Sequence, residues 1–561
     1  MSIAVSFEDL TFTYRATEKP ALENIRGHLE EGQWVALMGQ SGAGKSTLCC
    51  CLNGLVPRFF RGDYQGRVMV KGQEVARRTV AEMSRTVGIV FQDFEAQLFS
   101  TNVELEMAFG PENQNLPRAE IGRRIERYLR LVGLENLRRR EPATLSGGQK
   151  QRLAIGSVLA LEPEVLVLDE PTTDLDPRGR EEVLALAANL RKGGRTILVV
   201  DHEPETAIDA DAVWLLREGR VVAEGAPSTI LTDLPLLESC GIKPPPPLEL
   251  FQSLGWPGKP LTPDAAVELM KREGLKGREG APSSSQPVHP DTRDVVLKTE
   301  GLRYAYPSYP VEALRGIDLS IRRGEFVAIL GQNGSGKTTL AKHFNGLLRP
   351  TSGTVWLEGK PTPAYTHGDM ARRVGYVFQN PDHQIFARTV HDEVGFGLKM
   401  LGASPKIISD RVAEALSVVE LRGYEQKVPF ALTKGERQRV AVASVLAVQP
   451  HVLILDEPTT GLDYGQQRRT MEMLKRLNGQ GHTIIIITHS MWVAAEYAER
   501  TIAIKDGQVL LDGPTRLVFQ EEGLLAEASL RIPSLVQLSN RLGCRSLTLR
   551  GLTEELRERA R

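Results

Sequence analysis

"GQSGAGKST" at residues 39–47 and "GQNGSGKTT" at residues 331–339 decide the fold that we expect for this chain. Each stretch follows a short apolar run, "WVALM" at residues 34–38 or "FVAIL" at residues 326–330, and leads into a helix-like stretch. Strand, glycine-rich loop and helix in this order are typical of a phosphate-binding loop, because glycines let backbone N–H groups close around phosphate oxygens at a helix amino terminus. Two matches in register argue against a chance glycine-rich turn. The sequence therefore predicts two phosphate-binding α/β units.

Each loop also has a lysine and a hydroxyl residue with a predicted role. We expect Lys45 and Lys337 to reach the β- and γ-phosphates, and Ser46 and Thr338 to hold Mg²⁺. The predicted ATP-binding residues of the loops are Gly39, Gln40, Ser41, Gly42, Ala43, Gly44, Lys45, Ser46 and Thr47, and Gly331, Gln332, Asn333, Gly334, Ser335, Gly336, Lys337, Thr338 and Thr339. ATP and Mg²⁺ are thus the expected cofactors.

The chain aligns with itself over nearly its whole length, which indicates a tandem duplication. The first copy is five residues longer than the second around "VPRFFRGDYQG", residues 56–66, and we interpret this difference as a loop insertion. We predict a first repeat at residues 1–280 and a second repeat at residues 294–561. Between them, residues 281–293 contain the Pro- and Ser-rich stretch "APSSSQPVHP", which suits an extended linker.

Composition narrows the class of protein. The 561 residues contain 69 Lys and Arg and 70 Asp and Glu, so the overall basicity of a nucleic-acid binder is missing and no nucleic-acid partner is expected. No apolar run is long enough to span a membrane, and "MSIAVSFEDL" lacks the build of a signal peptide, so we expect a cytosolic chain. The five cysteines lack metal-ligand spacing, and we expect them to be reduced and structural.

Two further apolar runs end in a pair of carboxylates, "VLVLDE" at residues 165–170 and "VLILDE" at residues 452–457. Each run is typical of a buried parallel strand. Behind a phosphate-binding loop, Asp169 and Asp456 suit Mg²⁺, and Glu170 and Glu457 suit a base that polarises the attacking water. His202 and His489 follow at similar spacing, which favours γ-phosphate sensors over structural histidines. The predicted catalytic residues are Glu170, Glu457, His202 and His489.

The order of phosphate-binding loop, "LSGGQ" (residues 145–149), "LDEPTT" (residues 168–173) and histidine resembles that of ATP-binding cassette (ABC) ATPases. The resemblance covers nearly the whole chain, twice. It implies two α/β P-loop NTPase domains, each with a helical subdomain and a small C-terminal helical tail. It also implies head-to-tail closure on two ATP molecules, with the pairing inside one chain or between chains left open.

The same resemblance gives roles to residues outside the loops. Tyr14 and Tyr306 would stack on adenine, with packing against the strand as the alternative. Gln92 and Gln379 would link Mg²⁺ and the attacking water to the transport partner. Asp176 and Asp463 would interact across the dimer. In the signatures, the implied ATP-binding residues are Ser146, Gly147, Gly148, Gln149, Thr433 and Gly435. The implied Mg²⁺-binding residues are Ser46, Gln92, Asp169, Thr338, Gln379 and Asp456.

The two signature motifs differ. The first reads "LSGGQ", whereas the second reads "LTKGE", with Lys434 and Glu436 in place of a glycine and a glutamine. We expect Lys434 to add bulk and Glu436 to add a carboxylate near phosphate. Because each nucleotide of a cassette dimer lies between the loop of one half and the signature of the other, the site on Lys45 should be impaired and the site on Lys337 should carry most turnover.

The segments "FQDFEAQLF" (residues 91–99) and "FQNPDHQIF" (residues 378–386), together with the paired tails, resemble ATPase subunits of energy-coupling factor importers for vitamins and transition-metal ions. This resemblance implies a transmembrane scaffold protein and a substrate-binding membrane protein as partners, and a peripheral location on the cytoplasmic side of the membrane. We expect Leu98, Phe99, Ile385 and Phe386 to contact the scaffold, or else to fill the helical subdomain. The first segment departs from the family in having Phe94 in place of proline.

Two other functions stay open. The chain could be the fused ATPase of a conventional sugar importer, which the two segments and the paired tails disfavour. It could also be a soluble ABC ATPase acting on ribosomes or DNA, for which a charged helical linker or a basic extension would be expected. The transported solute is not encoded, because no residue of an ATPase subunit need touch it.

Overall fold

The structure is a computed structural model that describes residues 2–15, 17–172, 175, 177–275, 293–307 and 311–560. Its contacts divide the chain into two compact units, Met1–Gln252 with Pro257–Thr262, and Ser253–Trp256 with Pro263–Arg561. The predicted linker lies outside the described residues except for Arg293, and so does Asp176. The domain boundaries at 280 and 294 therefore stay predictions.

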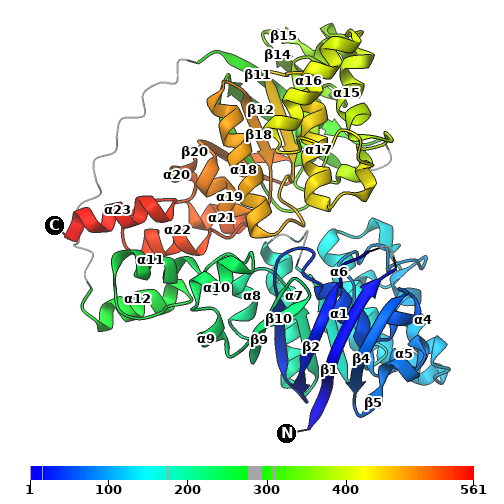
Figure 1. Ribbon diagram of the computed structural model, residues 1–561. Helices are drawn as coiled ribbons and strands as arrows, with labels where there is room; N and C mark the ends of the chain where they lie inside the picture. Colours follow the sequence, from blue (N-terminus) through cyan, green and yellow to red (C-terminus); the bar gives the residue numbers. More distant parts are fainter. Residues whose placement is uncertain are drawn as a thin grey trace. The chain divides into compact units, whose positions relative to one another are not determined.

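The first repeat contains two sheets and helices around them (Figure 1). Its strands are β1 (Ile3–Tyr14), β2 (Leu22–Glu30), β3 (Trp34–Met38), β4 (Gly62–Val70), β5 (Gln73–Glu74), β6 (Val87–Val90), β7 (Val165–Asp169), β8 (Thr196–Val200), β9 (Ala212–Arg217) and β10 (Arg220–Gly225). Its helices are α1 (Lys45–Leu52), α2 (Leu55–Arg58), α3 (Val80–Met83), α4 (Val103–Asn113), α5 (Arg118–Leu131), α6 (Gly147–Leu159), α7 (Pro177–Lys192), α8 (Pro204–Ala207), α9 (Pro227–Ile230), α10 (Leu234–Ser239), α11 (Pro246–Leu254) and α12 (Pro263–Arg272).

The second repeat has the same order of helices and strands, except that no described helix corresponds to α2. Its strands are β11 (Val295–Ala305), β12 (Glu312–Arg322), β13 (Phe326–Leu330), β14 (Ser352–Leu357), β15 (Lys360–Pro361), β16 (Val374–Val377), β17 (Val452–Asp456), β18 (Thr483–Ile487), β19 (Arg500–Lys505) and β20 (Gln508–Pro514). Its helices are α13 (Lys337–Phe344), α14 (His367–Ala371), α15 (Val390–Met400), α16 (Pro405–Val418), α17 (Lys434–Leu446), α18 (Tyr464–Gly479), α19 (Met491–Tyr497), α20 (Thr515–Val518), α21 (Glu522–Glu527), α22 (Ser534–Arg541) and α23 (Leu549–Ala560).

The six-stranded sheet of each repeat is covered on both faces. In the first repeat its order is β10-β9-β3-β8-β7-β6, and only β10 is antiparallel to its neighbour. Trp34, Ala36 and Met38 of β3 pack into the core beneath the helices, whereas Val35 and Leu37 pack against the four-stranded antiparallel sheet β2-β1-β4-β5. Burial on both faces explains why the strands read as continuous apolar runs.

The parallel order of these strands positions the predicted site. The phosphate-binding loop follows β3, the carboxylate pair ends β7, His202 follows β8, and Gln92 follows β6. Because β3, β8, β7 and β6 are parallel neighbours, their carboxyl ends lie along one edge of the sheet. In the second repeat, the carboxyl ends of β13, β18, β17 and β16 lie along one edge of the sheet in the same way.

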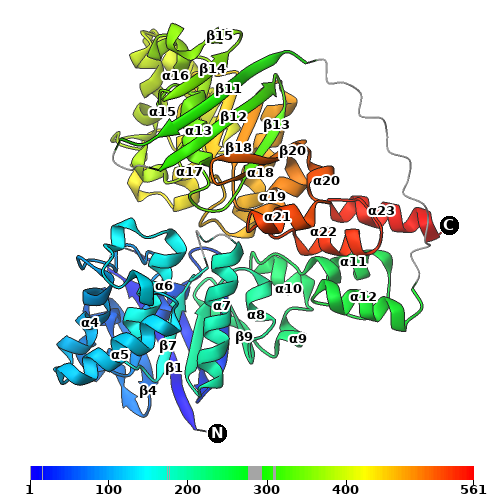
Figure 2. The ribbon, with the colours of Figure 1, turned by 180° about the vertical axis from the view of Figure 1, so that it is seen from behind.

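Each repeat carries a helical subdomain, and each ends in short helices, as predicted for this fold class. Helices α4, α5 and α6 form the subdomain of the first repeat, and α15, α16 and α17 that of the second (Figure 2). Within the second compact unit, tail helix α12 packs against α22, and Asp264 pairs with Arg541. In the part of the chain that is described, no helix combines the length and apolar character needed to cross a lipid bilayer.

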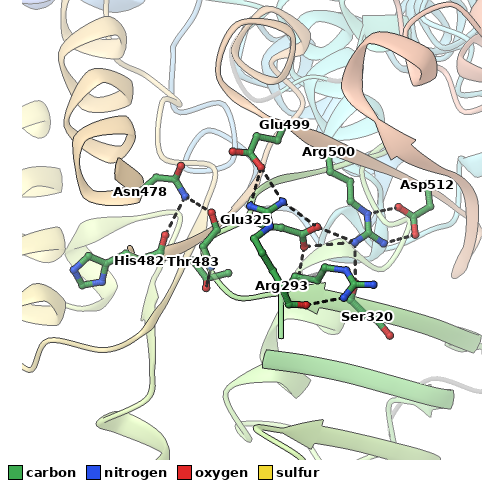
Figure 3. A network of polar contacts seen from close by, with 11 residues as sticks. Arg293, Ser320, Glu325, Asn478, His482, Thr483, Glu499, Arg500 and Asp512 are labelled. Carbon is green, nitrogen blue, oxygen red and sulfur yellow. Dashed lines mark hydrogen bonds and ion pairs between the residues drawn. The ribbon is translucent and has the colours of Figure 1, made fainter. Parts of the chain in front are cut away.

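A network of charged residues holds the start of the second repeat (Figure 3). Arg500 donates to both carboxylate oxygens of Asp512 at 2.7 Å and to Glu325 at 3.3 Å, and the Glu325 side chain is only 5% exposed. Arg293, the last residue of the predicted linker, donates to Glu499 at 3.2 Å. The end of the predicted linker is thus fixed to the body of the second repeat.

Candidate active sites

The lysine of each phosphate-binding loop lies inside its own loop. Lys45 Nζ donates to the carbonyl oxygens of Gly39 at 2.7 Å and Gln40 at 3.0 Å. Lys337 makes the same two bonds in the second repeat, at 2.8 and 3.0 Å. Both lysines are buried, so each loop surrounds a positive charge with backbone groups. Such a loop is a suitable binding site for the β- and γ-phosphates of a nucleotide.

Glycine is required where the loop enters the helix. Gly44 precedes α1 with φ +103°, a conformation that disfavours any side chain. A Cβ atom at this position would lie 2.3 Å from the carbonyl oxygen of Ala21. Gly336 repeats this arrangement before α13, where a Cβ atom would lie 2.6 Å from the oxygen of Ala313. The predicted loop residues therefore form one tight turn in each repeat.

Asp169 ends β7 and Asp456 ends β17, and each contacts the hydroxyl residue of its own loop. Thr338 Oγ1 donates to Asp456 Oδ2 at 2.9 Å, and Ser46 bonds Asp169 in the first repeat. Both aspartates are 3% exposed. Among the described residues, neither Asp169 Oδ1 nor Asp456 Oδ1 has a hydrogen-bond partner. Buried acceptor oxygens next to a hydroxyl suit a hard cation such as Mg²⁺.

The two aspartates differ in one neighbour that sequence reasoning missed. Tyr376 donates its hydroxyl to Asp456 Oδ2 at 2.8 Å, whereas the aligned residue of the first repeat is Ile89. Burial raises the pKa of Asp169 from an ordinary 3.8 to about 6. Burial also raises the pKa of Asp456, and the hydrogen bonds from Tyr376 and Thr338 oppose this rise. The sequence difference between "GIVF" (residues 88–91) and "GYVF" (residues 375–378) could have indicated that only the second repeat has a tyrosine at this position.

The glutamate after each aspartate has a strained backbone and a different partner in each repeat. Glu170 and Glu457 have φ +48° and +49°, which is uncommon for residues other than glycine and is often found at functional sites. Gln92 Nε2 donates to Glu170 Oε2 at 2.7 Å. In the second repeat, His489 Nδ1 lies 2.9 Å from Glu457 Oε1. The structure thus brings each predicted base together with one of its predicted neighbours.

The pairing with histidine affects the ionisation of Glu457. Burial raises the pKa of this carboxyl, but the charge and hydrogen bonds of His489 and the charge of Lys337 outweigh burial, and the net pKa is below its usual range. Glu457 is therefore ionised near neutral pH and able to accept a proton or a hydrogen bond from water.

His202 in the first repeat is positioned by a buried aspartate that sequence reasoning also missed. Asp201 accepts hydrogen bonds from the hydroxyls of Thr172 at 2.8 Å and Thr206 at 3.0 Å, and from the backbone N–H of His202 at 2.7 Å. The second repeat has Thr488 at this place. Comparison of "VVDHE" (residues 199–203) with "IITHS" (residues 486–490) would have shown that only the first repeat has an aspartate before this histidine.

The two predicted adenine-stacking tyrosines lie next to the loops. The hydroxyl of Tyr14 lies 3.0 Å from Thr47 Oγ1, and the hydroxyl of Tyr306 lies 3.0 Å from Thr339 Oγ1. Each ring is partly exposed, with 36% of Tyr306 accessible. A ring anchored to the last residue of the loop and open to solvent on one side suits a base whose phosphates lie in that loop.

Both signature motifs begin a helix, and both form a capping box. Ser146 caps α6, where its backbone N–H donates to Gln149 Oε1 at 3.0 Å. Thr433 caps α17, where its backbone N–H donates to Glu436 Oε2 at 2.8 Å. Gly147 and Gly148 lie in the first turn of α6, and Gly435 lies in the first turn of α17. Asp463 similarly caps α18, accepting from the Gln466 N–H at 2.8 Å.

The Glu436 carboxylate, which we expect near phosphate, accepts hydrogen bonds from two hydroxyl groups. The Thr433 hydroxyl donates to Glu436 Oε2 at 2.8 Å, and the Tyr424 hydroxyl donates to Oε1 at 2.9 Å. Burial raises the pKa of Glu436, but its hydrogen bonds to Thr433 and Tyr424 give a net pKa below the usual range. The carboxylate is therefore ionised and directed at its own helix cap. In the first repeat, Leu137 aligns with Tyr424.

An exposed pair of aromatic rings occupies the same place in both helical subdomains. Phe99 is 62% exposed, and its ring centroid lies 4.6 Å from that of Phe109 on α4. Phe386 is 61% exposed, and its ring centroid lies 4.7 Å from that of Phe396 on α15. Both pairs are edge to face. Each repeat thus presents one apolar patch next to the segment that follows its glutamine.

The other two residues of the predicted contact surface have a different role. Ile385 is 4% exposed and Leu98 packs against the core, so these two side chains fill the subdomain. Buried Glu393 accepts the backbone N–H of Phe386 at 2.9 Å, and Glu106 does the same for Phe99 at 3.1 Å. The aromatic residues are therefore held in an exposed position by a buried carboxylate in each repeat.

Comparison with known proteins agrees with this geometry. Residues 22–173 and 314–460 match the sequence profile of the ABC transporter family. A predicted ABC transporter ATP-binding protein of Caldanaerobacter subterraneus subsp. tengcongensis is 50% identical over 96% of this chain and 96% of its own. One from Methanosarcina acetivorans is 43% identical over 95% of this chain and 90% of its own.

Among solved structures, cbiO1 from Clostridium perfringens, part of the ABC transporter complex cbiONQ, is similar to part of the chain. It is 38% identical, covers 44% of this chain and 100% of its own, and gives a TM-score of 0.39. The family match covers both phosphate-binding loops and both carboxylate pairs, so the two sites are those of ATP-hydrolysing cassettes. The chain belongs to the ABC transporter family and consists of two ATPase domains fused in one polypeptide.

Proposed function

We propose that this ATPase is the energy-coupling subunit of an energy-coupling factor importer for a vitamin or a transition-metal ion. One observation carries the proposal, namely the exposed pairs Phe99/Phe109 and Phe386/Phe396 at equivalent positions of the two repeats. Two equivalent apolar patches suit a membrane scaffold that offers one coupling helix to each cassette. The chain would then act at the cytoplasmic face of the membrane, together with the scaffold and a substrate-binding membrane protein.

The location of the patches supports a coupling role. Gln92 begins the segment that leads to Phe99, and its side chain also contacts Glu170. A partner helix that moves Phe99 would therefore act on a short segment whose other end contacts the proposed base. Burial of exposed aromatic side chains is a major source of binding energy at protein interfaces.

The test is copurification of the chain with its membrane partners, followed by identification of the ligand that they bind. The double variant Phe99→Ser, Phe386→Ser should lose the scaffold and keep its ATP affinity. Leu347→Ser is the matched control, because Leu347 is also an exposed apolar residue (55%) but lies after α13, outside the helical subdomain. Normal copurification of the double variant would refute the docking surface. Recovery of a sugar-binding protein with the complex would favour a conventional sugar importer.

We further propose that each nucleotide binds the loop of one cassette and the signature of the other. Ser46 with Asp169, and Thr338 with Asp456, would hold Mg²⁺, since each pair offers a hydroxyl and a buried acceptor without a partner among the described residues. The ion would neutralise charge on the β- and γ-phosphates. Lys45 and Lys337 would bind the same phosphates, and Gln92 and Gln379 would complete the metal set.

Under this arrangement the two sites differ in their protein groups. Glu457 would orient and polarise the attacking water, and His489 keeps this carboxylate ionised and in place. Its site would use the intact signature of residues 145–149. Glu170 would act in the other site, which would use "LTKGE". We propose that the Lys337 site carries most turnover and that the Lys45 site mainly retains ATP.

A comparison of Glu457→Gln with Glu170→Gln tests this difference. In the assembled transporter, Glu457→Gln should reduce steady-state ATP hydrolysis distinctly more than Glu170→Gln. A larger loss from Glu170→Gln would reverse the assignment.

A further inference from the structure

The insertion that distinguishes the first repeat places two exposed aromatic rings beside Tyr14. Phe59 is 72% exposed and Phe60 is 39% exposed. The ring centroid of Phe60 lies 6.4 Å from that of Tyr14, and the two planes are inclined by 80°. Phe59 in turn contacts Phe60 edge to face, with 5.1 Å between centroids. The insertion therefore extends the aromatic surface that begins at Tyr14.

The Tyr14 ring is already fixed in position by two other residues. Its hydroxyl lies 3.0 Å from Thr47 Oγ1 at the end of the phosphate-binding loop. Buried Phe12 contacts the ring edge to face, with 4.8 Å between centroids. Phe60 is thus an added neighbour at the partly exposed end of an anchored ring.

Among its described residues, the second repeat shows no such addition. Tyr306 makes the same bond to its loop at 3.0 Å, and its aromatic neighbour is Tyr304, with 4.9 Å between centroids. The segment that corresponds to the insertion is the shorter "NGLLRPTSG", residues 345–353, which has no aromatic residue. Any ligand contact made by Phe60 is therefore specific to the first repeat.

We propose that Tyr14 and Phe60 form a two-sided aromatic corner for the adenine ring of the nucleotide bound at residues 39–47. Two rings at nearly a right angle let a flat base stack on one ring while its edge meets the face of the other, and both geometries are favourable for aromatic groups. Phe59 supports Phe60 from the solvent side. This inference rests on Tyr14 as the adenine-stacking residue.

The corner raises the ATP affinity of the first repeat and makes its binding depend more on the base. A single base–aromatic contact changes affinity by roughly fivefold or more. Tight binding in the first repeat agrees with a site that retains ATP. The contact from Phe60 arises from the insertion, so its effect is separable from that of the signature motifs.

The experiment is photolabelling of the full-length chain with 8-azido-ATP in EDTA, which prevents hydrolysis. Digestion and mass spectrometry give the half-saturating concentration separately for peptides of each repeat. Phe60→Ala should raise this concentration for the first repeat about fivefold and leave the second repeat unchanged. Phe60→Tyr, which keeps a ring, should behave as the unmodified chain, and Tyr14→Ala is the positive control. Competition by tripolyphosphate, which has no base, should be equal in all four proteins.

Each other outcome identifies the step that fails. If Tyr14→Ala weakens labelling and Phe60→Ala does not, the corner is wrong although Tyr14 still binds adenine. If neither variant matters and tripolyphosphate competes as well as ATP, base recognition at Tyr14 is wrong, and the corner with it. If Phe60→Ala leaves labelling unchanged but loses the membrane partners, the insertion is a docking element and the proposal is overturned.

Discussion

Glu436→Gln is the substitution that tests most directly how the second signature differs from the first. In the present chain the Glu436 carboxylate accepts both the backbone N–H and the hydroxyl of Thr433, each at 2.8 Å. An amide oxygen at this position can still accept the N–H, as Gln149 does for Ser146 at 3.0 Å. It would no longer provide the negative charge that holds the hydroxyl proton. The substitution should therefore free the Thr433 hydroxyl to donate to a phosphate.

The expected gain in ATP affinity follows from the hydrogen bond between the Thr433 hydroxyl and Glu436, which must otherwise break before the hydroxyl can donate to a phosphate. A hydrogen bond to a charged group contributes about 1.5–3 kcal/mol, and partial exposure of this one reduces the figure to about 1–2 kcal/mol. Since 1.4 kcal/mol is a factor of ten, Glu436→Gln should increase ATP affinity at the Lys45 loop by roughly fivefold to thirtyfold. The reciprocal Gln149→Glu should weaken binding at the Lys337 loop by a similar factor and reduce turnover.

The assay measures ATP affinity at each loop of the full-length chain by photolabelling with peptide mapping. Tyr424→Phe is the matched control, because it removes the bond to Oε1 and leaves the bond between Thr433 and Glu436. Thr433→Ala should have little effect alone, since the hydroxyl is already engaged, but should abolish the gain when combined with Glu436→Gln. A gain that persists in the double variant, or no gain in Glu436→Gln, would refute the reasoning.

Three further predictions concern stability and assembly. Burial raises the pKa of Asp169 in the folded chain, so its ionisation costs no stability below about pH 4 and its full cost applies above about pH 6. Asp169→Asn should therefore stabilise the nucleotide-free first repeat by about 3 kcal/mol at pH 7.5, as measured by hydrogen exchange. This gain should exceed the gain from Asp456→Asn in the second repeat. Arg500→Ala should destabilise the second repeat by about 3 kcal/mol in urea, because it leaves buried Glu325 without its nearest cation; loss of under 1 kcal/mol would contradict this. Cleavage within residues 281–290 should leave two fragments that copurify, since α12 packs against α22; separate elution with ATP and the membrane partners present would show that the linker is more than a tether.

The parts of the site that follow from local patterns were predictable from the sequence. Glycine spacing identified both loops, because a Cβ at Gly44 or Gly336 would meet backbone oxygen. Apolar runs identified the buried strands and therefore the edge where Asp169 and Asp456 lie.

Side-chain partners across the fold were not predictable in this way. No pattern in one segment indicates that Tyr424 donates to Glu436, or that Ile385 is buried while Phe386 is exposed. These outcomes depend on which neighbouring element packs against the residue. The residue type alone did not indicate the partners of the Glu436 carboxylate, whose Oε2 accepts from Thr433 in its own helix cap and whose Oε1 accepts from Tyr424.

The differences between the repeats point to the same division of roles, although they arise at separate places. The Lys337 site would combine the ionised Glu457 and its partner His489 with a signature whose serine hydroxyl is not held by a carboxylate. The Lys45 site would combine a signature whose Thr433 hydroxyl is bound to Glu436 with an aromatic corner that favours retention of the base. A hydroxyl that is engaged elsewhere lowers the ability to stabilise charge on the γ-phosphate, whereas a base contact raises affinity without promoting hydrolysis. Because the base contact offsets affinity that the engaged hydroxyl costs, these changes together favour slow hydrolysis with retained ATP in one site and turnover in the other, in agreement with two complete phosphate-binding loops and one intact signature.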